Sequence, residues 1–227
     1  MTIFRTGACL LCHNTLSVKN PSICDACTAD WLPLMHTCPK CANPVTQPGI
    51  PCGRCIKDPM PWHSLCCAGH YEGPSAWLIK RLKYRKQLAC AAILSAQLLK
   101  SIRDGQHDVP QAIIPMPLHW RRLWLRGFNQ SKLIAAQLGK EFQIPMITRG
   151  ISRIRHTAPL EDMDRRSRMR IMKRAFTIAP LPYRHVAIVD DVLTSGASAM
   201  ALSHALLEAG ITRVDLWVVA KTPTAMR

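Results

Sequence analysis

Eight cysteines in the first quarter of the chain have the spacing of metal ligands. The chain has 227 residues and eleven cysteines, eight of which form four Cys-x-x-Cys pairs. The two thiolates of one pair can bind the same metal ion, and a second pair completes a closed tetrahedral site. Four thiolates per site favour zinc, with an iron–sulfur cluster as the alternative. The predicted metal ligands are Cys9, Cys12, Cys24, Cys27, Cys38, Cys41, Cys52 and Cys55.

The four pairs can combine in two ways. Sequential use joins the first pair to the second and the third to the fourth, which gives two zinc ribbons in tandem, whereas a cross-brace joins the first pair to the third. Connections of only eleven and ten residues within the sequential combinations favour the tandem order. Four disulfides are a further alternative, but they require an oxidising compartment, and we expect no export signal in residues 1–12. We therefore expect residues 1–58 to form a double zinc-ribbon module that depends on its metal for folding.

Three cysteines, Cys66, Cys67 and Cys90, fit no ligand spacing. Free cysteines are among the most buried residue types in proteins. We expect these three to be buried structural thiols.

Two adjacent carboxylates follow an apolar run near the end of the chain. Asp190 and Asp191 come directly after Val186–Val189, and the segment Thr194–Ser198 then opens a helix. In α/β sheets ligands bind at the carboxyl ends of strands, where small residues and a helix N-terminus attract phosphate. Carboxylates accept hydrogen bonds from vicinal hydroxyls, so the stretch predicts a ribose 5-phosphate site. The alternative is an ordinary strand–turn–helix in which a hydroxyl of the segment caps the helix.

The elements that must position these groups form an α/β pattern after a Pro-rich break at 57–62. Apolar runs predict strands over residues 65–71, 112–115, 176–178, 185–189 and 214–220. Helical periodicity predicts helices over residues 74–84, 87–102, 129–142 and 198–209. The alternation favours βαβ units, so residues 62–227 are predicted to form a mostly parallel sheet flanked by helices.

Composition excludes several classes of protein. The chain is 48% hydrophobic and 19% charged, which excludes wholesale disorder. Its longest apolar run, Leu88–Leu99, is too short to span a bilayer, so we expect a cytoplasmic chain with no membrane span.

The net charge of +16 is concentrated in residues 119–174, where Arg165, Arg166 and Arg168 could meet phosphate. Direct binding of single-stranded or double-stranded DNA fits this charge, but the cysteine-rich segment has few aromatic side chains for base stacking.

The motifs together resemble a known family. Val186–Ser198 is similar to the phosphoribosyl-pyrophosphate (PRPP) signature of type I phosphoribosyltransferases. The cysteine pairs, Tyr71–Pro74 with Leu82–Tyr84, Ile114–His119 and Arg126–Gln130 resemble, in the same order, the ComF/GntX family. The resemblance implies a type I phosphoribosyltransferase-like fold and a role in uptake or use of extracellular DNA. It also implies DNA-processing proteins as possible partners.

The resemblance also implies roles for individual residues. Asp190 and Asp191 match the acids that bind the ribose hydroxyls, and Thr194, Ser195, Gly196, Ala197 and Ser198 match the loop around the 5-phosphate. The loop on the pyrophosphate side is matched by Pro115, Met116 and Pro117. A further family motif is matched by Arg126 and Gln130. Lys83 is either a phosphate contact or a surface lysine. The implied catalytic residues are Asp190, Asp191 and Arg168, with Mg²⁺ on the pyrophosphate.

Two functions remain open from the sequence. One is a Mg²⁺-dependent phosphoribosyltransferase whose acceptor no motif identifies. The other is a non-catalytic nucleotide-binding or nucleic-acid-binding adaptor that keeps the PRPP signature as a sensing site or scaffold. Leu160 and Ile171 replace a Gln and an Asn that are frequent in the family pattern, and these departures weaken the case for turnover more than the case for binding.

Overall fold

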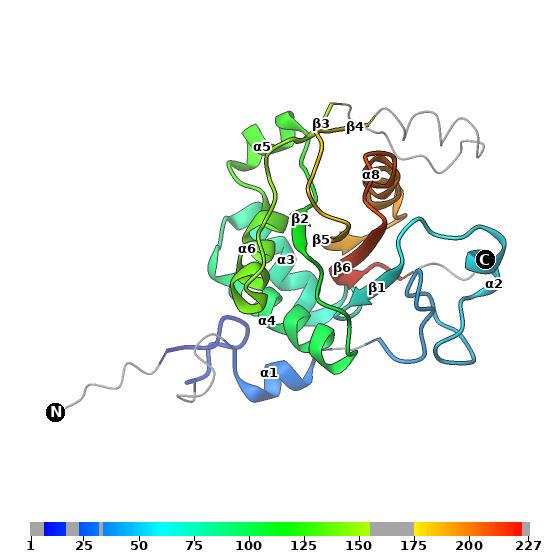
Figure 1. The fold of residues 1–227 in the computed structure, drawn as a ribbon. Coiled ribbons are helices and arrows are strands. Elements are labelled where there is room, and N and C mark those ends of the chain that lie inside the picture. The colour runs from blue at the N-terminus through cyan, green and yellow to red at the C-terminus, as the bar shows by residue number, and fades with distance from the viewer. Residues whose placement is uncertain (1–6, 17–22, 32–33, 155–174, 224–227) are drawn as a thin grey trace.

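The computed structural model describes residues 7–16, 23–31, 34–154 and 175–223. Its centre is a four-stranded parallel sheet of order β1-β6-β5-β2 (Figure 1). The strands are β1 (Ser64–Cys67), β2 (Ala112–Pro115), β5 (His185–Leu193) and β6 (Arg213–Lys221). The two central strands are the long ones, and their apolar residues are almost wholly buried, as expected for a sheet covered on both faces.

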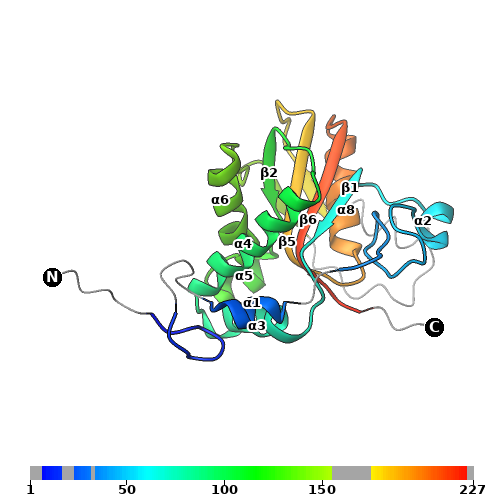
Figure 2. The same ribbon diagram turned by 90° about the horizontal axis from the view of Figure 1, so that it is seen from below.

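Helices cover both faces of this sheet (Figures 1 and 2). One face carries α3 (Gly73–Arg85), α4 (Ala89–Asp104) and α6 (Gln130–Phe142), and the other carries α8 (Ala197–Glu208). The predicted α/β class with a parallel sheet flanked by helices is therefore confirmed. β5 lies where the chain passes from helices on one face to α8 on the other, which is the position where α/β sheets bind ligands.

Several predicted bounds need correction. The predicted strand 65–71 is only the short β1, which ends at Cys67. Residues 68–71 stay beside β6 through the hydrogen bond from the Ala68 N–H to the Val218 carbonyl and a bridge between His70 and Lys221. β5 continues four residues beyond the predicted Val189. The predicted strand 176–178 exists as β4 (Phe176–Ile178), but it pairs antiparallel with β3 (Ile151–Arg153) outside the parallel sheet.

The cysteine-rich segment packs on both sides of the domain and carries two short helices, α1 (Asp25–Ala29) and α2 (Gly53–Lys57). Cys9, Leu16, Ile23 and Trp31 join the apolar core that includes residues of α3, α4 and α6. Ala42 joins the other core, which includes residues of α8. Figure 2 shows α1 and α2 on opposite sides of the sheet.

Candidate functional site

Both predicted cysteine sites assemble, and they do so in the tandem order. Within each tetrad the four Sγ atoms lie within 4.8 Å of one another. Zn–S bonds of about 2.3 Å place the sulfurs of a tetrahedral site about 3.8 Å apart. The Sγ–Sγ distances between Cys12 and Cys24 and between Cys41 and Cys52 are both 3.6 Å. Sequential pairing is therefore confirmed, the cross-brace is wrong, and each tetrad could bind zinc.

At one sulfur of each tetrad, that of Cys9 and that of Cys38, backbone N–H groups favour the thiolate form that binds metal. The N–H groups of Leu11 and Cys24 donate to Cys9 Sγ at 3.4 Å. Burial opposes ionisation of Cys9, but the N–H donors outweigh it and lower the pKa of this thiol to about 6. The same balance lowers the pKa of Cys38 to about 7.

The three cysteines outside the tetrads behave as structural thiols. Cys66 and Cys90 are buried, as predicted, and Cys67 is partly buried. Burial raises the pKa of all three thiols.

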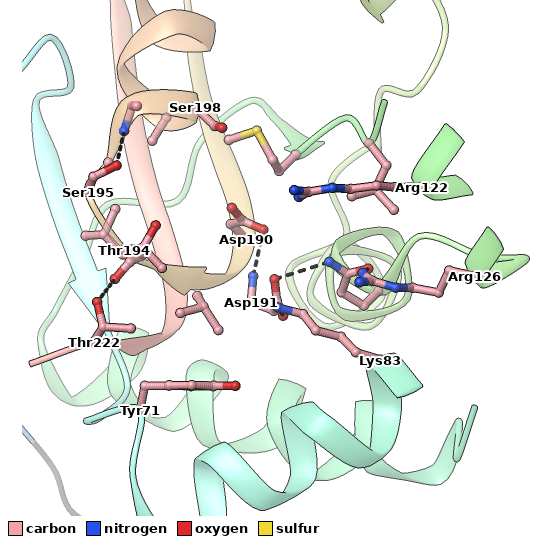
Figure 3. A pocket seen from close by; sticks show the side chains of 18 of the residues that line it. Tyr71, Lys83, Arg122, Arg126, Asp190, Asp191, Thr194, Ser195, Ser198 and Thr222 are labelled. Carbon is pink, nitrogen blue, oxygen red and sulfur yellow. Dashed lines mark hydrogen bonds and ion pairs between the residues drawn. The ribbon is translucent and has the colours of Figure 1, made fainter. Parts of the chain in front are cut away.

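A cavity of about 820 Å³ opens at the carboxyl ends of β5 and β6 (Figure 3). It brings together residues that the sequence analysis took from four separate motifs: Lys83, Met116, Arg126, Gln130, Asp190, Asp191, Thr194, Ser195, Gly196, Ala197 and Ser198. Pro115 and Pro117 flank Met116 in the chain but do not line the cavity. Arg165, Arg166 and Arg168 lie outside the described residues.

The acidic pair lies within β5 rather than after it, and Asp190 is in register with Val218 of β6. Asp191 is 3% exposed, and its carboxylate forms an ion pair with Lys83 of α3. Lys83 is therefore part of the site and is not a free surface lysine. Burial, and then the charge of Asp191, raise the pKa of Asp190 to about 7.

This pKa predicts how stability depends on pH. The folded pKa of Asp190 lies above the unfolded value, so folding favours its protonated form, and its contribution to stability is lost as pH rises towards 7. We expect the Asp190→Asn variant, which lacks this titration, to gain stability relative to wild type between pH 5 and pH 8. Urea unfolding at both pH values, in buffer with zinc, measures the difference. A difference independent of pH would contradict the raised pKa.

The motif Arg126–Gln130 connects to the acidic pair through a chain of side-chain contacts (Figure 3). Arg126 Nη1 donates to Gln130 Oε1 at 2.6 Å, and Gln130 Nε2 donates to Asp191 Oδ1 at 3.3 Å. Gln130 is only 3% exposed. With Lys83 on its other oxygen, Asp191 is fixed from both α3 and α6.

The start of α6 also fixes the other carboxylate and the loop after β2. Ser131 Oγ donates to Asp190 Oδ1 at 2.9 Å. Asn129 caps α6 by accepting from the Ser131 N–H at 3.0 Å, and its Nδ2 donates to the Met116 carbonyl, also at 3.0 Å. The motif and the adjacent Ser131 thus hold both carboxylates and the Met116 loop, a role that the sequence analysis could not derive.

The N-terminus of α8 opens into the cavity. Its N-cap is Gly196, whose φ of 78° suits glycine, and among the described residues no side chain forms a cap hydrogen bond. The nearest hydroxyl, Ser195 Oγ, accepts from the Ala197 N–H only at a long 3.5 Å. The alternative of an ordinary hydroxyl N-cap is therefore not what the structure shows, and the N–H groups that follow Ala197 in the first turn of α8 remain available to an anion.

Three cations on the cavity wall were not predicted as site residues: Lys86, Arg122 and Arg153. Arg153 Nη2 donates to Ser198 Oγ at 3.3 Å, so it reaches the loop at the start of α8. Burial, and then the charge of Arg122, lower the pKa of Arg153. Two cations close enough to repel each other favour an anionic ligand between them.

The sequence held only weak signals for these cations. Arg122 lies on α5 (Trp120–Arg126), and its spacing of four from Arg126 would place both on one helical face. Trp120, Leu123 and Trp124 of α5 have helical spacing, but the helix has only seven residues and buries none of its side chains, so this pattern is a weak signal. Arg153 lies on β3, which is too short to show an alternating pattern.

No helix in the described part of the chain is long and apolar enough to cross a bilayer.

Comparison with known proteins finds relatives that are similar to this chain over nearly its whole length. The chain is 34% identical to the DNA utilization protein YhgH of Salmonella typhimurium strain LT2 over 221 residues, covering 95% of this chain and 97% of the relative. It has the same identity and coverage with the YhgH protein of Escherichia coli strain K12. It is 31% identical to competence protein F of Haemophilus influenzae over 229 residues, covering 97% of this chain and the whole relative. No family model matches the chain. With the tandem cysteine tetrads, the parallel sheet and this similarity along nearly its whole length, the chain belongs to the ComF/GntX family.

Proposed function

We propose that the chain binds PRPP in the cavity and transfers its phosphoribosyl group to an acceptor. The observation that carries the proposal is the convergence of an acidic pair, an uncapped helix N-terminus and five cationic side chains in one cavity. The cations are Lys83, Lys86, Arg122, Arg126 and Arg153. A sugar with adjacent hydroxyls and phosphate groups at both ends satisfies all three features at once.

We propose a place for each part of PRPP in this arrangement. The N–H groups at the start of α8 would bind the 5-phosphate, and Asp190 and Asp191 would accept hydrogen bonds from the ribose hydroxyls. Arg122 and Arg153 would face the pyrophosphate. In the transfer the bond between C1 and pyrophosphate breaks, pyrophosphate leaves with the electron pair, and the acceptor forms the new bond to C1. Each cation that stabilises the leaving charge can contribute about 10²–10³ in rate.

Mg²⁺ would neutralise the pyrophosphate oxygens in such a reaction. The described residues form no cage of oxygen ligands, since Asp191 is paired with Lys83 and Asp190 with Ser131. This donor set suits an ion that binds mainly through substrate phosphates and water.

Calorimetric titration with PRPP and Mg²⁺ tests the proposal. We expect micromolar binding to the zinc-loaded protein, lost in the Asp190→Asn/Asp191→Asn variant. Asp104→Asn, an exposed change on α4, is the matched control and should bind as wild type. Absence of heat with wild type would reject PRPP as the ligand.

We also propose a role in the use of extracellular DNA. It rests on relatives named for DNA utilization and for competence.

A second candidate function, binding of single-stranded nucleic acid, rests on α5. Trp120 and Trp124 are 63% and 80% exposed on this helix at the rim of the cavity. The guanidinium of Arg121 stacks over the Trp120 ring at 5.3 Å, and that of Arg126 lies 5.9 Å from the ring of Tyr84, which is also exposed. Exposed aromatic rings among arginines are typical of surfaces on which bases stack while cations contact the backbone.

Fluorescence anisotropy with a labelled single-stranded oligonucleotide tests this second candidate. Each stacked base contributes about 1–3 kcal/mol, so we expect the Trp120→Ala/Trp124→Ala variant to bind at least tenfold more weakly. The control variant Leu123→Ala/Leu125→Ala removes exposed apolar area from the same helix without removing rings. Equal losses in both variants, or affinity independent of salt, would contradict base stacking.

A further inference from the structure

Trp62 connects the second cysteine tetrad to the body of the protein. Its side chain is 2% exposed, and its Nε1 donates to the Lys40 carbonyl at 2.7 Å. Lys40 lies between the ligands Cys38 and Cys41, and its own ammonium donates to the His63 carbonyl. Two hydrogen bonds therefore tie the turn that carries the thiolates to residues 62–63.

The other side of the Trp62 ring lies against the loop at the start of α8. A β-carbon built on Gly196 would lie 3.6 Å from Trp62 Cη2 and 3.6 Å from Leu193 Cδ1. Trp62 also belongs to the same apolar cluster as Leu193 and Ala199, which flank the loop. One indole thus donates a hydrogen bond to the metal-binding turn and lies next to the loop that would bind phosphate.

The end of β6 borders the same loop. Lys221, the last residue of β6, is 7% exposed, and its Nζ donates to the Thr222 carbonyl at 2.5 Å. The next residue, Thr222, lines the cavity, and its N–H donates to the Leu193 carbonyl at 3.1 Å.

The first tetrad is attached elsewhere. Trp31 Nε1 donates to the Ala68 carbonyl at 2.9 Å, and Trp31 belongs to the core on the opposite face of the sheet. Within the described parts of residues 1–31, no side chain lines the cavity. The two tetrads are therefore similar as metal sites but unequal in their contact with the cavity.

We propose that Trp62 is a positioning residue through which the second tetrad, when it holds metal, fixes the 193–198 loop in its ligand-binding conformation. Metal occupancy of the second tetrad then controls affinity for a phosphorylated ligand, and occupancy of the first does not. The identity of that ligand rests on the proposed function, whereas the coupling between tetrad and loop does not.

Hydrogen exchange of the zinc-loaded protein without ligand tests the coupling directly. Trp62→Phe removes the indole N–H, and Trp31→Phe makes the same change at the first ribbon. Since one hydrogen bond of ordinary strength corresponds to about a two- to tenfold change in equilibrium, we expect exchange in the peptide covering 193–198 to rise by that factor in Trp62→Phe only. Peptides from 185–189 and from α4 should exchange as in wild type. Equal loop exchange in both variants, or a uniform rise through the core, would overturn the proposal.

A second comparison tests the role of the metal. Cys41→Ala and Cys12→Ala each remove the second thiolate of the first pair in a tetrad. Faster exchange of the 193–198 peptide in Cys41→Ala alone supports the proposal, and faster exchange in Cys12→Ala to the same degree or more overturns it.

Titration with PRPP and Mg²⁺ then connects the loop to binding. Trp62→Phe should raise the dissociation constant several-fold while Trp31→Phe leaves it unchanged. If wild type binds no PRPP, the proposed function fails, but the exchange data still decide the coupling. If wild type binds and both variants bind equally well, the coupling fails while the function stands.

Discussion

Removing zinc with a chelator is expected to destabilise the whole described fold and not only the cysteine-rich segment. A structural zinc site contributes about 10–16 kcal/mol to folding at neutral pH, whereas the net stability of a domain is about 5–15 kcal/mol. Cys9 and Trp31 belong to the core that includes residues of α3, α4 and α6, and Ala42 belongs to the core that includes residues of α8. Loss of both metals therefore disturbs both cores of the α/β domain.

Calorimetry with and without chelator measures this effect, with a chromophoric dye to count the released metal. We expect two zinc ions per chain and a loss of the main thermal transition when both are removed. Excess zinc added after the chelator is the control and should restore the transition. An α/β transition that survives with both ions removed would show that residues 1–58 fold independently of the rest.

Replacing Lys83 with methionine is expected to cost about 3–5 kcal/mol, because it leaves Asp191 as a buried charge without its ion-pair partner. The Lys83 side chain is 16% exposed and that of Asp191 is 4% exposed, so water replaces little of the lost interaction. The second substitution Asp191→Asn removes the charge, and the double variant should recover most of the loss. A gain in stability when Asp191→Asn is added to Lys83→Met indicates a buried ion pair, because lost packing at Lys83 would not be restored by that second substitution.

Urea unfolding in excess zinc checks this prediction. Lys80→Met, an exposed lysine on the same helix, controls for the removal of positive charge and should change stability by less than about 0.5 kcal/mol. A loss of similar size in Lys80→Met, or no recovery in the double variant, would contradict the buried ion pair.

Local sequence patterns were sufficient for some parts of the fold. Ala112–Pro115 and Phe176–Ile178 were predicted with the bounds that the structure has. The tandem order of the tetrads followed from the short connections between pairs. In each case the signal lies within a few neighbouring residues.

Other features depend on contacts between distant residues and could not be predicted in this way. Gln130 and Asp191 are 61 positions apart, and nothing in either segment indicates that they are hydrogen-bonded. The continuation of β5 through Asp190 and Asp191 goes against the low strand propensity of aspartate and depends on pairing with β6. Whether the 176–178 strand belongs to the parallel sheet depended on β3, a three-residue strand that carries no periodic signal.

The exposure of α5 has a consequence for how proteins with this architecture can diversify. Substitutions in a helix that buries no side chain cost little folding stability, so its outward positions are open to change. Arg126, by contrast, is tied to Gln130 and through it to the acidic pair. A library randomised at positions 120, 121, 123 and 124 would therefore vary the rim of the cavity on a constant chemical centre. Such a division between a tolerant rim and a constrained interior allows new ligand preferences to be selected without first rebuilding the fold.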